Sequence, residues 1–256
     1  MTPLRRRITR ALASERLVQH VRVDAGGGRE LLFDCPTARS LMDPLSFEGN
    51  EPETLEWIDG FETGRDIVFW DIGANIGTFS LYAALRPNVL TYAFEPSAAS
   101  FASLARNIEL NRMGERILPF CLALADRTGI DFLHMANSGA GHATHAFGTR
   151  TTIDGEIAPV FSQATPGMTA DDFRAVFEAP QPDHIKLDVD SIETSIIRGG
   201  AQTFRQARTV MVEAYNSARE PQTGVFAALE ELGFEADDDF NRGRWHNHLF
   251  RNKAFG

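Results

Sequence analysis

The chain has 256 residues and a formal net charge of −10, with 43% apolar and 23% charged residues. These values are typical of a globular protein, and the acidic balance argues against general binding to the phosphate backbone of nucleic acids. Two cysteines, Cys35 and Cys121, are too few for a disulfide framework. No apolar run approaches the roughly 20 residues of a membrane span. We therefore expect a cytoplasmic protein without stable membrane insertion.

The first 50 residues predict a small appendage to a larger domain. Residues 4–17 place apolar side chains on one face of a short helix, and no unbroken apolar stretch follows the arginines as it would in a secretion signal. The segments 18–24 and 30–35 flank a glycine run and predict a β-hairpin. We expect a loop over 36–50 and then a helix over 52–60, which begins at a proline beside acidic residues.

Strands and helices alternate through the rest of the chain. The segment 67–70 is apolar throughout, which is typical of a parallel strand covered on both faces. Further strands are expected at 89–94, 116–123, 184–189, 209–214, 234–236 and 246–251, with helices at 76–85, 97–110, 168–177, 192–204 and 223–232. This order predicts a doubly wound α/β fold with a mostly parallel, seven-stranded, Rossmann-like sheet. The segment 128–165 predicts a β insertion or flap after the third strand, and we expect a single domain over 1–256.

The first candidate site follows the strand at 67–70. Gly73 and Gly77 would allow the backbone to approach a ligand closely. Asn75 stands where the dinucleotide fingerprint requires glycine, so a pyrophosphate-binding loop is missing. Glu95 ends the next strand, 24 positions after Asp71, where a carboxylate can accept two hydrogen bonds from a ribose diol. S-adenosylmethionine (SAM) is an adenosine cofactor without a pyrophosphate, and it satisfies both observations.

The sequence also resembles the FkbM family of SAM-dependent methyltransferases over about residues 50–215. The residues that carry this resemblance are Asp71-Ile72-Gly73-Ala74-Asn75-Ile76-Gly77, Phe94-Glu95-Pro96, Leu104, Asn107, Leu110-Asn111, Leu122-Ala123-Leu124-Ala125-Asp126, Ile185-Lys186-Leu187-Asp188-Val189-Asp190-Ser191-Ile192-Glu193, Gly199-Gly200-Ala201 and Glu213. Ser191 departs from the pattern, since the family usually has glycine there.

The resemblance implies transfer of the SAM methyl group to a hydroxyl of a sugar, a glycan, a polyketide or a similar small molecule. It also implies that Asp71, Gly73 and Gly77 surround the methionine part of SAM, that Glu95 holds the ribose and that Asp126 lies near the adenine. Ser191 affects the expected geometry on the acceptor side.

The second candidate site lies at the end of the fourth predicted strand. Methyl transfer to an alcohol needs an aligned acceptor oxygen and a group that receives its proton. Asp188 would face the same crevice as Asp71, and Lys186 points to the same side of the strand. We expect Asp188 to act as base or orienter, Lys186 to pair with it, and Glu193 to position the acceptor or to stabilise a helix N-terminus. Neighbouring carboxylates could also hold a divalent cation, but we assign no metal site.

Histidines provide an alternative base. His134, His142 and His145 lie in the predicted insertion without strict metal-ligand spacing, and a flap could bring one of them over the crevice. His246 and His248 share a strand face, but no further zinc ligands lie nearby, so we expect them on the surface of an edge strand.

Three other functions compete with a small-molecule O-methyltransferase. Methylation of a macromolecule is disfavoured by the acidic net charge and by the lack of an Asn/Asp-Pro-Pro-Tyr motif. A nicotinamide oxidoreductase is disfavoured by Asn75. A non-catalytic SAM-binding module is prompted by Ser191. The sequence gives no indication of an oligomeric state.

Overall fold

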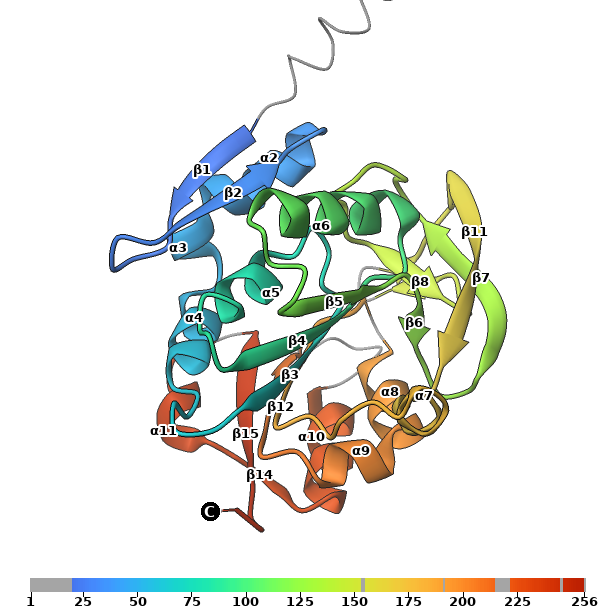
Figure 1. Ribbon diagram of the computed structural model, residues 1–256. Helices are drawn as coiled ribbons and strands as arrows, with labels where there is room; N and C mark the ends of the chain where they lie inside the picture. Colours follow the sequence, from blue (N-terminus) through green and yellow to red (C-terminus); the bar gives the residue numbers. More distant parts are fainter. Residues whose placement is uncertain (1–19, 153–154, 191, 215–221, 245, 256) are drawn as a thin grey trace, which may run out of the picture.

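The computed structural model describes residues 20–152, 155–190, 192–214, 222–244 and 246–255. Its centre is a sheet of seven strands: β3 (Ile67–Ile72), β4 (Val89–Phe94), β5 (Ile117–Phe120), β12 (His184–Leu187), β13 (Thr209–Glu213), β14 (Phe234–Ala236) and β15 (Asn247–Asn252). Their order across the sheet is β14-β15-β13-β12-β3-β4-β5 (Figure 1). The neighbours from β13 to β5 are all parallel. The seven expected strands are present, but the sheet is mixed, because β15 runs antiparallel between β13 and β14.

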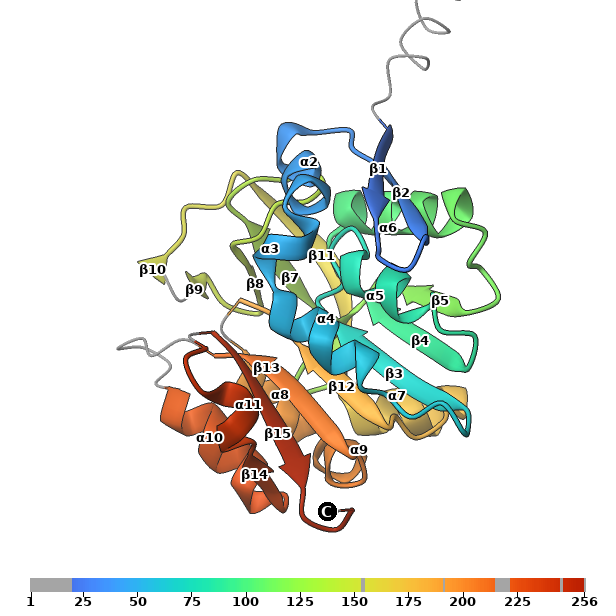
Figure 2. The same ribbon diagram turned by 90° about the vertical axis from the view of Figure 1, so that its left-hand side faces the viewer.

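Helices cover both faces of this sheet (Figure 2). One face carries α4 (Pro52–Asp59), α5 (Thr78–Ala83), α6 (Ala98–Leu110) and α11 (Asp238–Asn241), and the other carries α7 (Ala170–Phe177), α8 (Glu193–Gly199), α9 (Ala201–Arg205) and α10 (Gln222–Glu231). Successive side chains of a strand point to opposite faces, so Phe69 packs in the first hydrophobic core and Trp70 in the second. Burial on both faces explains why β3 lacks polar alternation.

The N-terminal region contains the predicted hairpin, β1 (His20–Asp24) and β2 (Glu30–Asp34), which pair in antiparallel register. The expected loop over 36–50 is wrong, because this segment forms α2 (Ala38–Leu45) and α3 (Phe47–Asn50). Thr37 and Ser40 form a capping box that begins α2, and Pro44 lies in its last turn, where the helix ends one residue later. The helix expected over 4–17 lies outside the described residues.

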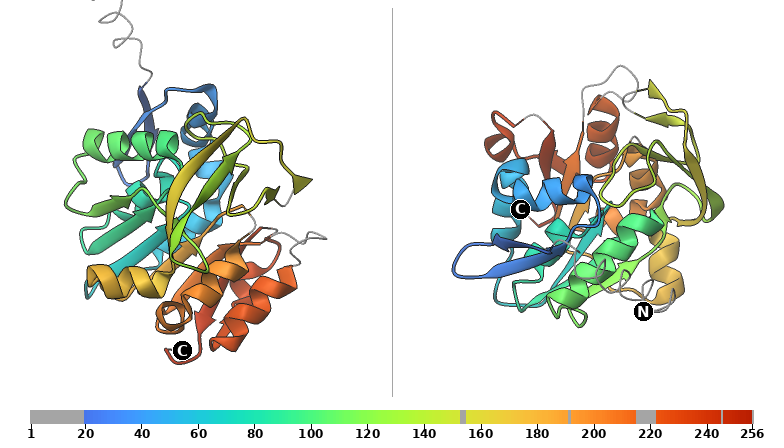
Figure 3. Two further views of the ribbon diagram at one scale, coloured as in Figure 1. Left: turned by 90° about the vertical axis from the view of Figure 1, so that its right-hand side faces the viewer. Right: turned by 90° about the horizontal axis from the view of Figure 1, so that it is seen from above.

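The segment after β5 builds a second sheet beside the carboxyl ends of the central strands (Figure 3). Its strands are β6 (Ala123–Leu124), β7 (Gly129–Met135), β8 (His145–Phe147) and β11 (Phe161–Met168), in the order β6-β11-β7-β8. A short pair, β9 (Thr151–Thr152) and β10 (Gly155–Glu156), lies between β8 and β11 in sequence. The β character expected for 128–165 is therefore found. None of the helices in the described part of the chain has both the length and the apolar composition needed to cross a bilayer.

Candidate active site

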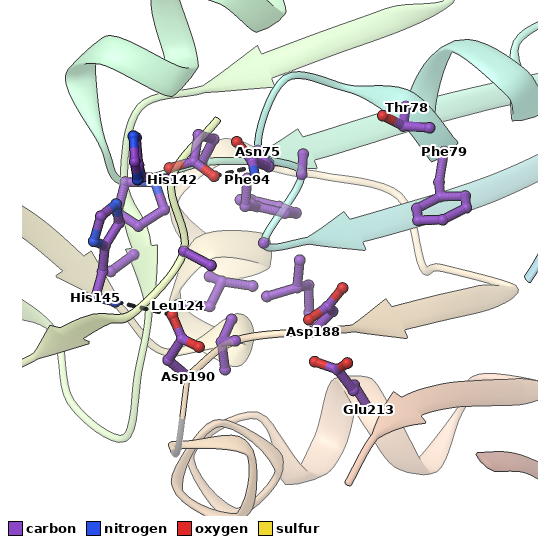
Figure 4. A pocket seen from close by; sticks show the side chains of 18 of the residues that line it. Asn75, Thr78, Phe79, Phe94, Leu124, His142, His145, Asp188, Asp190 and Glu213 are labelled. Carbon is purple, nitrogen blue, oxygen red and sulfur yellow. Dashed lines mark hydrogen bonds between the residues drawn. The ribbon is translucent and has the colours of Figure 1, made fainter. Parts of the chain in front are cut away.

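A cavity of about 450 Å³ opens at the carboxyl ends of β3, β4, β12 and β13 (Figure 4). This is the edge at which open α/β sheets bind ligands. The residues that line the cavity come from the ends of these strands and the turns after them, from the β insertion, from α2 to α5 and from the start of β15. They are Arg39, Asp43, Phe47, Glu51, Glu53, Ile72, Gly73, Ala74, Asn75, Thr78, Phe79, Phe94, Glu95, Pro96, Leu122, Ala123, Leu124, Leu133, His142, Ala143, His145, Phe147, Asp188, Val189, Asp190, Ile192, Glu213, His246 and Asn247.

The glycine turn after β3 brings two strand ends into close contact. A Cβ atom on Gly73 would lie 1.8 Å from the carbonyl oxygen of Asp188, and the φ of Gly73 is +88°. A Cβ atom on Gly77 would lie 2.5 Å from Cδ1 of Leu104, again at a positive φ of +93°. Both positions therefore favour glycine for their backbone conformation, and at Gly73 a Cβ atom would also clash with the fixed backbone of Asp188. The turn leaves a backbone-lined wall between β3 and β12.

Glu95 is the carboxylate on which this turn is built. Its side chain is buried, and its two oxygens accept hydrogen bonds from the backbone N–H of Asn75 at 2.8 Å and of Ser97 at 2.7 Å. Burial raises the pKa of Glu95 to about 7, although these two backbone donors act in the opposite direction. The side-chain Oδ1 of Asn75 is buried and has no hydrogen-bond partner. A ligand that donates hydrogen bonds would find acceptors on both residues.

Lys186 is a buried cation beneath the cavity. It lies on β12 opposite Asp71 of β3, and its Nζ donates to Oδ2 of Asp188 at 2.5 Å and lies 3.6 Å from Oε2 of Glu51. Burial acts to raise the pKa of Asp188, but the Lys186 ammonium outweighs burial and lowers it. Asp71 differs, since burial raises its pKa despite Lys186 and a 2.5 Å hydrogen bond from Ser80. Lys186 thus holds Asp188 in its ionised form.

Asp188 and Glu213 point toward one another at the ends of neighbouring strands (Figure 4). Together with Lys186, Glu213 acts to lower the pKa of Asp188. Over the residues that the structure describes, no cluster of three or more His, Cys, Asp or Glu side chains is arranged to hold a metal ion.

The insertion closes the opposite end of the cavity. Its loop contacts the glycine turn through Asn75 Nδ2, which donates to the carbonyl of Gly141 at 3.4 Å. The backbone N–H of His145 donates to Asp190 at 2.9 Å, and neither ring nitrogen of His145 has a hydrogen-bond partner. Burial lowers the pKa of His145, so its ring is neutral and offers one donor and one acceptor.

The residues predicted from the sequence lie at different depths. Four of them line the cavity: Gly73, Asn75, Glu95 and Asp188. Asp71 and Lys186 lie buried beneath it, Gly77 caps α5, and Glu193 is buried at the start of α8. The side chain of Asp126 is 54% exposed and lies 3.7 Å from Arg127, and it is not among the described lining residues. Ser191 lies outside the described residues.

The side of the cavity formed by α2, the start of α4 and the start of β15 was not expected from the sequence. Arg39 and Asp43 lie in the segment that was expected to be a loop, and Glu51 and Glu53 read only as an acidic helix start. The edge strand expected for His246 and His248 is wrong, because β15 lies between β13 and β14 and His248 on it is buried. His246, just before β15, is exposed as expected and also lines the cavity. These positions carry no motif of their own. The helix α2 and the start of α4 bring the first four to the site, and the antiparallel pairing of β15 with β13 brings the start of β15.

Comparison with known proteins decides the family. The model of the methyltransferase FkbM domain matches residues 71–236. The chain belongs to the FkbM methyltransferase family. The resemblance inferred from the glycine turn, Glu95 and the β12 segment is thereby confirmed.

The curated relatives are also methyltransferases. The chain is 26% identical over 191 residues to the hexuronic acid methyltransferase AglP of Haloferax volcanii, which covers 73% of this chain and 74% of the relative. It is 44% identical over 66 residues to the 31-O-demethyl-FK506 methyltransferase FkbM of Streptomyces tacrolimicus, about a quarter of each chain (25% and 24%).

Among solved structures, a SAM-dependent methyltransferase from Agrobacterium tumefaciens aligns with a TM-score of 0.51 at 14% identity. The alignment covers 91% of this chain and 69% of that one. At this identity the likeness concerns the fold alone, and it agrees with the Rossmann-like α/β architecture described above.

Proposed function

We propose that this FkbM-family protein is a SAM-dependent O-methyltransferase that acts on a hydroxyl of a small molecule of sugar, glycan or polyketide type. One observation carries the proposal: the buried carboxylate of Glu95, fixed by two backbone N–H groups, opens on the same cavity as the ionised Asp188. A ribose-binding group and an acceptor-orienting group are thus combined at one sheet edge. The names of AglP and FkbM, which specify a hexuronic acid and 31-O-demethyl-FK506, support the sugar or polyketide skeleton of this acceptor class but not its charge, since a hexuronic acid is acidic.

The cavity fits the cofactor at its insertion end. Glu95 would accept hydrogen bonds from the ribose diol, and the wall of Gly73 would approach the methionine part without a side chain in the way. Asn75 Oδ1, buried and unpaired, would gain a donor. Leu122 and Leu124 offer apolar surface to the adenine. Asp71 and Gly77 would shape the turn from beneath, and Asp126, which does not line the cavity, is assigned no contact with the cofactor.

The Asp188 end would hold the acceptor. When bound, SAM supplies an electrophilic methyl group on a sulfonium, and the residues of this chain align the oxygen that attacks it. Asp188 would accept a hydrogen bond from the acceptor hydroxyl and would receive its proton as the methyl group passes from the sulfonium sulfur to this oxygen, the S–C bond breaking to leave neutral S-adenosylhomocysteine. Because Lys186 lowers the pKa of Asp188, this carboxylate is a weak base, and its main role is to orient the acceptor hydroxyl. Glu193 would support the turn from β12 into α8.

The proposal is tested with the full chain and labelled SAM. We expect calorimetry to detect binding of SAM and no binding of NAD, and we expect methyl transfer to at least one member of a panel of sugar and polyketide alcohols. Asp188→Asn should lose at least about 100-fold in turnover. The matched control is Asp239→Asn, at an exposed side chain that does not line the cavity, which should keep wild-type turnover.

Binding of NAD in place of SAM would overturn the cofactor assignment. Tight SAM binding with no turnover on any acceptor would instead identify a non-catalytic SAM-binding module. Full turnover by Asp188→Asn would exclude the role assigned to Asp188.

A further inference from the structure

The acceptor end of the cavity contains a polar cluster that lies outside the matched family domain of residues 71–236. Asn247, at the start of β15, is 2% exposed and lines the cavity. Its Nδ2 donates to Glu51 Oε2 at 3.1 Å and to Glu53 Oε1 at 2.9 Å, both at the start of α4. These two bonds fix the orientation of the amide, because only its nitrogen can donate to carboxylates. Its Oδ1 is left buried without a hydrogen-bond partner.

This cluster is connected to the proposed catalytic groups. Glu51 Oε2, which accepts from Asn247, also lies 3.6 Å from Lys186 Nζ, and Lys186 in turn donates to Asp188 at 2.5 Å. The same cavity wall therefore carries Asp188, which orients the reacting hydroxyl. It also carries the hydrogen-bond acceptors of Glu51 and Asn247, which are linked to Asp188 through Lys186. A ligand that reaches Asp188 with one hydroxyl has hydrogen-bond acceptors beside its neighbouring hydroxyls.

The charge of the lining restricts the ligand further. The described lining residues include seven carboxyl groups and a single guanidinium, that of Arg39. Arg39 lies 3.7 Å from the carboxylate of Asp43, so even this cation is partly neutralised by a neighbour. Among the lining residues that the structure describes, a carboxylate on the acceptor would meet like charges in a partly buried site and would find no cation other than the paired Arg39. Hydroxyl groups can donate hydrogen bonds to the carboxylate and amide oxygens of this wall.

We propose that Asn247, Glu51 and Glu53 form an acceptor-specificity site that selects a neutral, polyhydroxylated ring, such as an uncharged sugar, over its acidic counterpart. Asn247 Oδ1 accepts a hydrogen bond from a hydroxyl next to the one that Asp188 orients, and the two glutamates bind the adjoining hydroxyl. This inference rests on the proposed methyltransferase function and adds the charge and the hydrogen-bonding character of its acceptor.

The test uses matched neutral and acidic sugars as probes. The methyl glycosides of glucose, galactose and mannose are each compared with the methyl glycoside of the corresponding uronic acid, by saturation-transfer NMR on the full chain with S-adenosylhomocysteine present. We expect at least one neutral glycoside to bind about tenfold more tightly than its uronate, and Asn247→Leu to lose about tenfold in that affinity. Glu53→Gln should narrow the preference for the neutral sugar because it removes one negative charge.

Asn241→Leu is the matched control. Asn241 also bonds to β15, through both its amide atoms at 2.8 and 3.0 Å from Leu249, but it does not line the cavity. It should lower stability without changing the ratio of neutral to acidic binding.

The inference is overturned if no neutral glycoside binds, if uronates bind as tightly as their neutral partners, or if Asn247→Leu binds like the wild type. SAM binding, measured separately by calorimetry, tests the proposed function, so the two failures are distinguishable.

Discussion

Glu95 shows how much of the proposed chemistry depends on the environment of a single residue. Its carboxylate must be ionised to accept hydrogen bonds from two ribose hydroxyls in addition to those from Asn75 and Ser97. Burial raises its pKa to about 7, so it gains a proton as the pH falls below 7. We therefore expect the affinity for SAM to weaken about tenfold between pH 8 and pH 6. Calorimetry across this range measures the effect.

Glu95→Gln should bind SAM weakly and with little dependence on pH, because its amide does not titrate. Glu235→Gln, at an exposed site on β14, serves as the control and should follow the wild-type profile. A wild-type affinity that is constant from pH 6 to pH 8 would contradict the role assigned to Glu95.

Gly73 is the residue that allows β3 and β12 to meet. We expect Gly73→Ala to lower the free energy of unfolding by about 2 kcal/mol or more, because its Cβ would lie 1.8 Å from the Asp188 carbonyl oxygen and its φ is +88°. SAM binding should be lost with it. Gly26→Ala has a similar φ of +77° with no atom within 4 Å, so it isolates the cost of the backbone conformation. Urea unfolding of both variants gives the comparison, and equal losses would exclude the steric argument.

At the scale of elements, the sequence predicted the parts that rest on local patterns. The strands β3 and β4 are largely apolar, β12 and β13 follow the same order of strand and helix, and Ser97 caps the start of α6 with its side chain. The missed elements depend on contacts between distant segments. The helix α2 contains Pro44, which reads as a breaker, and its start is stabilised by Thr37, whose hydroxyl also donates to the carbonyl of Ala140. The acceptor wall was missed for the same reason, since the pairing of β15 decides where Asn247 lies.

The capping residue of α2 gives a test at this scale. Thr37 Oγ1 accepts from the backbone N–H of Ser40 at 3.0 Å and donates to the carbonyl of Ala140 at 2.7 Å. Thr37→Ala should cost about 1 kcal/mol of stability. It should also raise the KM for the acceptor, because α2 carries Arg39 and Asp43 at the cavity. Urea unfolding and acceptor kinetics measure these effects, and Thr37→Ser, which keeps the hydroxyl, should restore both. A Thr37→Ala protein of wild-type stability would refute this account.

On the scale of the whole molecule, one end of the central sheet forms the proposed binding site, and the other end contributes mainly to stability. The carboxyl ends of β3, β4, β12 and β13 surround the cavity, which contains unpaired polar atoms and carboxyl groups whose pKa values differ from their ordinary values. The amino end of β12 is instead tightly packed. There His184 stacks on Phe61 with ring centroids 4.0 Å apart, and its Nδ1 lies 2.8 Å from Thr209 Oγ1, which also accepts from Trp57. Substitutions at this end should change stability and leave ligand binding intact.

His184 allows this division to be tested through pH. Burial lowers its pKa to about 4 from an ordinary value of 6.5, so between these values the unfolded chain binds a proton that the folded protein does not. The stability of the wild type should therefore fall as the pH drops from 6.5 to 4, by up to about 3 kcal/mol from this group. His184→Gln, which does not titrate, should show a shallower loss in urea unfolding. At pH 7.5 the His184→Gln protein should bind SAM with wild-type affinity, because this side chain lies at the end of the sheet opposite the cavity. An unchanged pH slope in His184→Gln would show that other groups dominate the acid sensitivity, and a large loss of SAM binding would show that the two ends of the sheet are not independent.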